Sequence, residues 1–341
     1  MTKLRLAVIG TGMAWERLHL PALKELKDCY EIVALSNTSE DRLIQAADEI
    51  GLSHDHIYTN YHDMLNGEQI DVVNIAVPIE MNYFISEEVA RAGFNIICEK
   101  PLAPSMDQAE AYLKLQDKYN IKIMIAENHR YNEENILIKK LIDENRIGEV
   151  LYFVKNNVSN FEDAMVGDTF AAKEWRQHPE FKGGAILDAS VHDVATLEYI
   201  FGEVESVSAF GRPQKEDYAP YSVITSIMLF KNGVLGNYNY CVKGKELQNP
   251  FVGFRIFGTE GTIYLEDRMC GAINIMYKQD NKHEFVNYTP DRGYYNEFKN
   301  FYDAFMSNKT VEVTPEVELM DAKVVFTLLK SASKKKAMTI D

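Results

Sequence analysis

The chain has 341 residues, of which 46% are hydrophobic and 26% are charged, a globular composition long enough for two domains. Its 36 basic and 51 acidic residues give a net charge of −15, which argues against a nucleic-acid partner and against an anionic membrane surface. No apolar run approaches the ~20 residues of a membrane span. The N-terminus lacks a signal-peptide pattern and the four cysteines are scattered, so we expect a cytoplasmic protein.

The first elements predict a dinucleotide-binding start. An apolar strand over residues 4–9 leads into a G-x-G turn and then a helical stretch over residues 13–27. Glycines in this turn let a pyrophosphate approach the helix N-terminus, where free N–H groups and the helix dipole favour anions. The third glycine position of the usual pattern is occupied by tryptophan. We expect the cofactor to contact the turn and the helix start, namely Gly10, Thr11, Gly12, Met13, Ala14 and Trp15.

The end of the second strand, residues 31–35, bears on the choice of cofactor. An enzyme that uses NAD usually places an acidic residue here for the ribose hydroxyls, whereas this chain has a neutral Ser-Asn-Thr sequence with an arginine one helical turn later. This favours NADP over NAD by a small margin, because residues 40 and 41 are acidic. A neutral turn that tolerates either cofactor remains the alternative. The expected contacts are Ser36, Asn37, Thr38 and Arg42.

A histidine-containing segment follows the helix predicted over residues 41–50, which Gly51 closes. His54, His56 and His62 have no zinc-binding spacing and no cysteine nearby. We therefore expect no metal site.

The chain then continues as alternating strands and helices. Strands are predicted at residues 71–77 and 121–126 and helices at residues 81–92 and 105–119, with Ser105 capping the second helix. Between the helices, a buried strand beginning at Asn95 must end at Glu99-Lys100-Pro101, because proline cannot donate to a ladder. Residues 1–126 thus predict a Rossmann domain with a parallel, doubly wound sheet. Lys100 would lie at its ligand-binding carboxyl edge; a surface ion pair before a turn proline is the alternative.

Six stretches resemble the Gfo/Idh/MocA oxidoreductases, the family of glucose–fructose oxidoreductase and inositol dehydrogenase. They occur in family order at residues 7–12, 74–78, 98–102, 128–132, 183–188 with His192, and 257–261. The resemblance implies an oxidoreductase that uses NAD or NADP, with a Lys-Pro bond that is often cis. It also implies further cofactor contacts at Ala76, Val77, Pro78, Glu99, Lys100 and Asn128. One departure is Asn82, where many members have histidine; we expect it to affect the cofactor loop and not the acid–base groups.

The second half contains the remaining site candidates. A helix at residues 135–145 and a strand at 150–156 precede a polar loop with Trp175 and Arg176, which in the relatives lie near the cofactor. After Gly183-Gly184, a helix would place Asp188 and His192 on one face, four residues apart. Spacing alone fits an ordinary ion pair. The resemblance implies a catalytic set of Lys100, Asp188 and His192, in which histidine exchanges a proton and lysine stabilises an alkoxide.

From residue 204 onward, β-rich segments predict a large, mostly antiparallel sheet. Asn232-Gly233 is a hairpin signal between two of its strands, and closing helices are expected at residues 294–306 and 316–333. One face would pack on helices and the other would carry Tyr238, Tyr240 and Phe254 or their neighbours, depending on register. Residues 127–341 thus predict an α+β domain for substrate binding and oligomerisation. The resemblance implies that such sheets pair into homodimers or homotetramers.

These features favour an oxidoreductase that transfers a hydride between NAD(P) and a sugar, a polyol or a related hydroxyl or keto compound. Two alternatives remain from the same resemblance. One is a glycosidase that uses NAD transiently, and the other is a nucleotide-sensing regulator without catalysis. A regulator would not need the intact set of lysine, aspartate and histidine, so that set argues for an enzyme.

Overall fold

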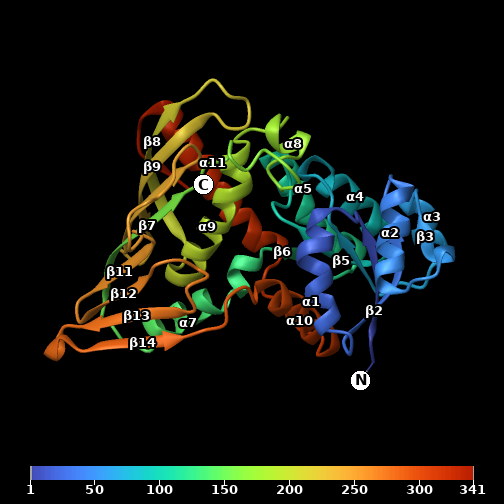
Figure 1. The fold of residues 1–341 in the computed structure, drawn as a ribbon, viewed down its shortest axis with the longest axis horizontal. Helices are drawn as coiled ribbons and strands as arrows, with labels where there is room; N and C mark the ends of the chain where they lie inside the picture. The colour runs from blue at the N-terminus through green and yellow to red at the C-terminus, as the bar shows by residue number, and fades with distance from the viewer. Residues whose placement is uncertain (1, 341) are drawn as a thin grey trace. The chain divides into compact units, whose positions relative to one another are not determined.

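The computed structural model describes residues 2–340, and its internal contacts divide the chain into two compact units (Figure 1). The first unit consists of Met1–Asn128 and Tyr294–Leu319, and the second of His129–Gly293 and Met320–Asp341. The first unit therefore contains residues 294–319, which sequence patterns had placed in the second domain.

The first unit is built on a six-stranded parallel sheet in the order β3-β2-β1-β4-β5-β6. The order reverses between β1 and β4, and in such sheets ligands bind at the carboxyl ends beside this point. The prediction of a parallel, doubly wound sheet is confirmed. The strands are β1 Leu4–Ile9, β2 Tyr30–Ser36, β3 Ile57–Tyr58, β4 Val72–Ile75, β5 Asn95–Glu99 and β6 Ile123–Ala126.

Helices lie on both faces of this sheet (Figure 1). The expected helix after the G-x-G turn begins as a π-helix and becomes α-helical around Pro21, which has no N–H to bond an earlier carbonyl. The expected helix at 105–119 is divided at Leu113, although Ser105 caps it as predicted. The helices are η1 Trp15–His19, α1 Leu20–Glu25, α2 Glu40–Ile50, η2 His54–His56, α3 Tyr61–Gly67, α4 Ile79–Arg91, α5 Met106–Tyr112, α6 Lys114–Tyr119 and α10 Gly293–Met306.

The second unit contains a nine-stranded sheet in the order β14-β13-β12-β11-β7-β10-β9-β8-β15. Only β7 and β10 run parallel to each other, so the prediction of a mostly antiparallel sheet is confirmed. The expected hairpin joins β9 to β10, with Gly233 at φ +89°. The strands are β7 Val150–Val158, β8 Val204–Pro213, β9 Tyr221–Phe230, β10 Leu235–Cys241, β11 Phe254–Gly258, β12 Gly261–Leu265, β13 Ala272–Tyr277, β14 His283–Asn287 and β15 Met338–Thr339.

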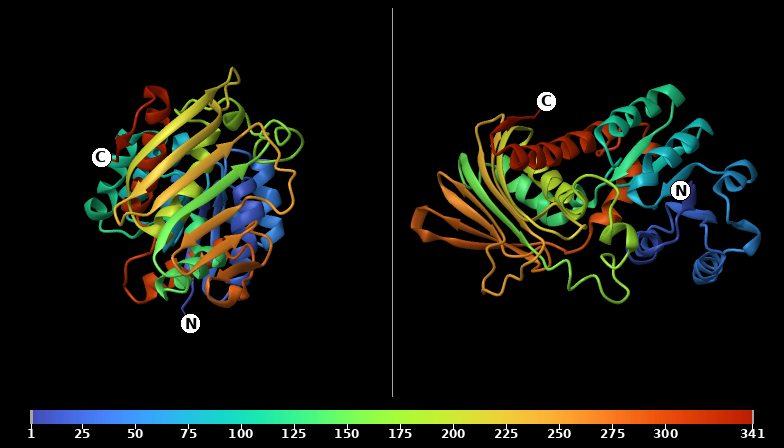
Figure 2. Two further views of the ribbon diagram at one scale, coloured as in Figure 1. Left: turned by 90° about the vertical axis from the view of Figure 1, so that its left-hand side faces the viewer. Right: turned by 90° about the horizontal axis from the view of Figure 1, so that it is seen from above.

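Helices cover one face of the nine-stranded sheet (Figure 2). The covered face carries the aromatic core, in which Phe153 of β7 stacks on Phe201 of α9 with ring centroids 4.8 Å apart. Tyr238, Tyr240 and Phe254 also lie on this face, so the open face carries their neighbours. The helices of the unit are η3 Asn128–Tyr131, whose first residue belongs to the first unit, α7 Glu133–Asp143, α8 Glu174–Gln177, α9 Ala185–Phe201, η4 Gln279–Asn281 and α11 Pro315–Lys334, which begins in the first unit.

No helix within residues 2–340 covers the opposite face of that sheet (Figure 2). Strand register places several large apolar side chains on this open face, and five of them are at least 48% exposed. They include Tyr152, Phe210, Ile227, Leu235, Phe257, Met276 and Phe285. Among the described helices, none has both the length and the apolar character needed to cross a bilayer.

Candidate active site

The G-x-G turn follows β1 at the carboxyl edge of the parallel sheet. Gly10 has φ +98°, and a Cβ there would lie 2.2 Å from the carbonyl oxygen of Ala76 at the end of β4. Only glycine allows this close approach of two chain segments. At Gly12, by contrast, a Cβ would meet no atom within 4 Å. The backbone at Gly12 is therefore accessible beside the start of a helical stretch, as a dinucleotide pyrophosphate requires.

The residues after β2 are tied to this turn. Asn37 donates from Nδ2 to Oγ1 of Thr11 at 2.9 Å, and its Oδ1 accepts from the backbone N–H of Ser39 at 3.0 Å. The amide therefore orients the turn and presents no negative charge at the strand end. Ser36 is buried, whereas Thr38 and Arg42 are exposed, the latter in the first turn of α2.

The other predicted contacts in the first unit differ in burial. Met13 and Trp15 are 8% and 1% exposed, so both side chains pack in the core, while Ala14 is half-buried. Val77 and Pro78 form the turn between β4 and α4. Asn128 is 2% exposed at the start of η3.

Lys100 follows β5, and its side chain is mostly buried at 9% exposure. The Lys100–Pro101 peptide bond is cis, as the resemblance implied. The preceding carboxylate of Glu99 accepts a hydrogen bond from Nε2 of His19 at 2.7 Å. Asn74 donates to the other ring nitrogen of His19 at 2.9 Å, which leaves Nε2 to carry the hydrogen. The motif is thus joined to the helix that follows the G-x-G turn.

A second carboxyl group lies close to Glu99 in the interior of the first unit. Glu297 of α10 is fully buried, and burial, followed by the charges of Glu99 and Glu127, raises its pKa well above the ordinary value. Burial among other carboxyl groups therefore favours the neutral form of Glu297.

Position 82, where the chain departs from the family, contacts the main chain of the lysine motif. Asn82 in α4 donates to the carbonyl oxygens of Glu99 and Pro101, at 2.8 and 2.9 Å. The sequence did not indicate this contact, because it depends on the packing of α4 against β5. The residue therefore holds the chain on both sides of Lys100.

In the second unit, Gly183-Gly184 leads into α9 and positions Asp188. Gly184 has φ +51°, and a Cβ there would lie 2.2 Å from the carbonyl oxygen of Tyr218. Asp188 lies in the first turn of α9, where the helix dipole favours its negative charge. It accepts a hydrogen bond from Nε of Arg176 at 2.7 Å. The Arg176 guanidinium lies 4.3 Å from the ring centroid of Trp175, so these three predicted residues are brought together.

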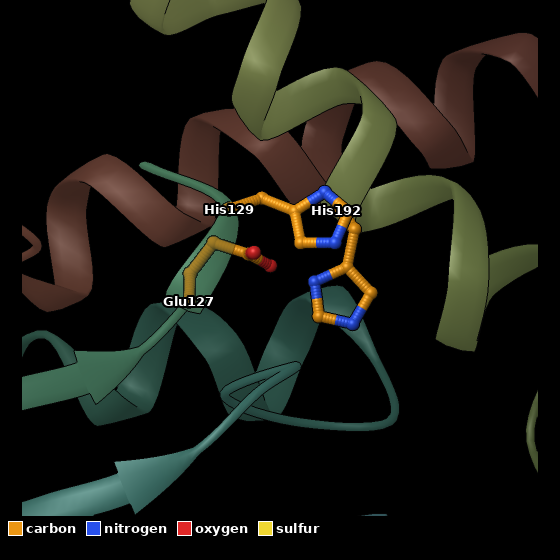
Figure 3. Close-up of side chains that lie close together, drawn as sticks. All are labelled: Glu127, His129 and His192. Atoms are coloured by element: carbon orange, nitrogen blue, oxygen red, sulfur yellow. The ribbon is translucent and has the colours of Figure 1, made fainter. Parts of the chain in front are cut away.

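His192 is half-buried one turn further along α9 and stacks on His129. The two ring centroids are 4.4 Å apart and the planes are 22° from parallel (Figure 3). Arg268 donates to Nε2 of His129 at 3.3 Å. Figure 3 also shows Glu127, which precedes His129 by two residues in the chain. The sequence did not identify His129 as a neighbour of His192, although it lies in one of the family-like stretches.

A buried polar network surrounds Asp193, the residue after His192. Its carboxylate accepts from Lys155 at 3.1 Å, from Asn157 at 2.9 Å and from the hydroxyl of Tyr238 at 3.0 Å. Burial would raise the pKa of Asp193, but the charge of Lys155 and the hydrogen bond from Asn157 outweigh it and lower that pKa. This carboxylate stays ionised and ties α9 to β7 and β10 at the residue after His192.

The three histidines near residue 60 pair with different carboxylates. His54 contacts Asp48 at 2.9 Å, and His56 contacts Glu68 at 2.7 Å. His62 contacts Glu88 at 3.3 Å. Each ring thus contacts a different carboxylate group.

Comparison with known proteins extends the resemblance to almost the whole chain. Residues 4–127 match the model of an oxidoreductase family with an NAD-binding Rossmann fold, and residues 139–340 match that family's C-terminal α/β domain. An uncharacterized protein of Saccharomyces cerevisiae is 27% identical over 98% of this chain and 97% of its own length. Levoglucosan dehydrogenase of Pseudarthrobacter phenanthrenivorans is 28% identical over 65% of this chain and 62% of its own length. The crystal structure of a Thermotoga maritima oxidoreductase, 26% identical, superposes with a TM-score of 0.87 over 99% of both chains.

Proposed function

Because the chain belongs to the Gfo/Idh/MocA family of oxidoreductases, with its NAD-binding Rossmann domain, we propose that it transfers a hydride between NAD(P) and a sugar, a polyol or a related compound. The observation that carries this proposal lies within the first unit. An accessible glycine turn after β1 and a mostly buried lysine after β5 occupy the same carboxyl edge of one parallel sheet. The levoglucosan dehydrogenase among the relatives supports a sugar substrate.

We propose the following roles for the side chains when an alcohol is oxidised. His192 accepts the hydroxyl proton, and the ammonium of Lys100 stabilises the developing alkoxide. Asp188, held by Arg176, orients His192 or binds a neighbouring hydroxyl. The nicotinamide, when bound, supplies the hydride acceptor. Gly10, Gly12 and the residues after β2 would hold its dinucleotide.

We propose NADP as the preferred cofactor. Asn37 makes two hydrogen bonds within the protein and leaves no carboxylate at the end of β2 that would repel a 2′-phosphate. Arg42 is exposed in the first turn of α2 and supplies a positive charge near this end of the sheet.

A substrate panel tests the function. Levoglucosan, D-xylose, D-glucose and myo-inositol are each mixed with NAD or NADP, and the nicotinamide absorbance is followed. We expect turnover with at least one compound and a larger kcat/KM with NADP than with NAD. Aryl glycosides are included without added nucleotide, because nitrophenol release with no nicotinamide signal would favour the glycosidase alternative. Absence of nucleotide binding would contradict the proposal.

Gly12→Asp provides the binding-defective control for this panel. A Cβ at Gly12 meets no atom within 4 Å, so we expect the variant to fold normally while its carboxylate repels the pyrophosphate. We expect NADP affinity to fall at least tenfold, about 1.4 kcal/mol, with an unchanged melting temperature. Calorimetric titration with NADP measures the affinity. Equal NADP affinity in both proteins would place the nucleotide elsewhere.

We further propose that the open face of the nine-stranded sheet pairs with a second copy of the chain. Its exposed side chains include Phe, Tyr, Met and Ile, and residue types of this kind are enriched in protein interfaces. Tyr152 stacks on Phe257 of the neighbouring strand at 4.4 Å, which presents a flat, ordered apolar surface. A homodimer formed this way, or a homotetramer built from two of them, would cover this face.

Sedimentation of Ile227→Asp tests this assembly. Ile227 is 57% exposed on β9, so a carboxylate at this position should leave the fold of the protomer intact. In an isologous dimer the same position is buried on both copies, so two carboxylates would lose their solvation and the dimer would be destabilised. We expect the wild type at a multiple of the protomer mass of 39.0 kDa and the variant at that mass. Met306→Asp, at a side chain 48% exposed on α10, is the matched control and should not dissociate. A wild-type monomer would refute the proposal.

A further inference from the structure

Asn82 makes a contact with the lysine motif that the proposed chemistry does not use directly. The residue lies in the first turn of α4 and is fully buried. Its single amide nitrogen donates both hydrogens to the main chain, one to the carbonyl oxygen of Glu99 and one to that of Pro101, at 2.8 and 2.9 Å. These carbonyls belong to the residues immediately before and after Lys100.

The orientation of this amide is fixed by its chemistry. A carboxamide has two N–H donors on one nitrogen, so it can bridge two acceptors, whereas its oxygen can only accept hydrogen bonds. Turning the amide over would set its oxygen against two carbonyl oxygens, an electrostatically unfavourable arrangement. Among the described residues Oδ1 of Asn82 has no donor of its own. The side chain is therefore oriented entirely by its contact with the lysine motif.

We propose that Asn82 is a positioning residue that sets the direction of the Lys100 side chain. Holding the carbonyls on both sides of one residue restricts its backbone dihedral angles and with them the Cα–Cβ direction. The bond from His19 to Glu99 holds the preceding side chain as well. This inference rests on the proposed role of Lys100 in hydride transfer. For a reacting group, a displacement of about 1 Å can lower the rate about 10²-fold.

The test compares Asn82→Leu with Asn95→Leu. Asn95 begins β5, donates to the carbonyl of Asp71 at 2.8 Å and accepts from the N–H of Lys122 at 2.8 Å. It therefore bridges main-chain groups at the opposite end of the strand that precedes Lys100. Leucine is close in shape to asparagine and donates nothing. We expect both variants to lose similar thermal stability, while only Asn82→Leu lowers kcat, about 10- to 100-fold, with KM for NADP within twofold.

Two further measurements distinguish a positioning role of Asn82 from a general loss of structural stability. In a Lys100→Met background, Asn82→Leu should lower the residual kcat by less than twofold, because the group it positions is absent. Asn82→Asp, which keeps the shape but replaces the donors with a carboxylate oxygen, should lower kcat in the wild-type background at least as much as leucine does. Should Asn82→Leu fail to fold, Asn82→Ala provides the test, because it removes the donors without adding bulk or a buried charge beside the two carbonyls. Turnover is measured with NADP and the panel sugar that reacts fastest.

The outcomes distinguish this inference from the function on which it rests. If Lys100→Met reduces turnover but Asn82→Leu and Asn82→Asp do not, the positioning role is refuted and the function stands. A loss of the same size in the wild-type and Lys100→Met backgrounds would likewise refute it, because the effect would not pass through Lys100. If Lys100→Met itself retains full turnover, the proposed function fails first.

Discussion

Lys100→Met is expected to lower kcat by about 10²- to 10⁴-fold, the range that one positioned charge or proton-transfer group contributes. Methionine retains most of the length and the apolar stem of lysine. It should therefore fill the space of the Lys100 side chain, which is only 9% exposed. What is lost is the ammonium that would stabilise the alkoxide. NADP affinity should stay within a few fold, because the glycine turn after β1 is unchanged. Steady-state kinetics on a panel sugar and calorimetric titration with NADP measure the two quantities.

Lys122→Met is the matched control for this prediction. Lys122 precedes β6, at the opposite edge of the same sheet, and its Nζ donates to the carbonyl of Lys309 at 2.6 Å. Its removal takes away the same charge without touching the carboxyl edge, so kcat should change less than twofold. If Lys100→Met and Lys122→Met had equal turnover, Lys100 would have no part in the reaction.

Local patterns predicted most of the first unit because its strands are short apolar runs bounded by glycine or proline. Pro78 and Pro101 ended two strands, and the G-x-G turn identified the start of the fold. The two-residue β3 and the short helix α3 were missed, since a polar segment with several histidines carries too weak a periodic signal over so few residues. The late segment of residues 294–319 could not be assigned to this unit from composition.

Contacts between distant residues account for what the sequence did not predict in the candidate site. His19 and Glu99 are 80 positions apart, and the two histidines that stack in the second unit are far apart as well. The sequence indicated only that Asn82 lies near a cofactor loop. Its contact with the carbonyl groups of Glu99 and Pro101 depends on the packing of α4 against β5, which is a tertiary property. Similarly, alternation in β10 defined two faces, but only packing against α9 decided that Tyr238 faces inward.

The family-like stretch at residues 128–132 contains Arg130, which forms a buried ion pair within the second unit. Arg130 forms two bonds with Asp321 of α11, at 2.6 and 3.1 Å, and the side chains are 9% and 0% exposed. Close by, burial and then the negative charge of Asp321 raise the pKa of Glu198 to about 8. Glu198 is therefore mostly protonated at neutral pH, and the carboxylate paired with Arg130 is that of Asp321.

Arg130→Met is expected to lower the free energy of unfolding by about 3–5 kcal/mol, because it leaves the Asp321 charge buried without its partner. The double variant Arg130→Met/Asp321→Leu removes both charges and should regain most of that loss, since a buried pair and an apolar pair of similar size often have similar stability. Urea denaturation of the three proteins measures the differences.

Arg146→Met is the matched control in the same unit. Arg146 pairs with Glu284 at 2.9 Å, but both side chains are about a third exposed, at 33% and 31%. Solvent screens such a pair, so this variant should lose no more than about 1 kcal/mol. Comparable losses for Arg130→Met and Arg146→Met, or a double variant no more stable than Arg130→Met alone, would mean that an unpaired buried Asp321 is not what destabilises the protein. The ion pair would then act in this unit through packing and not through charge compensation.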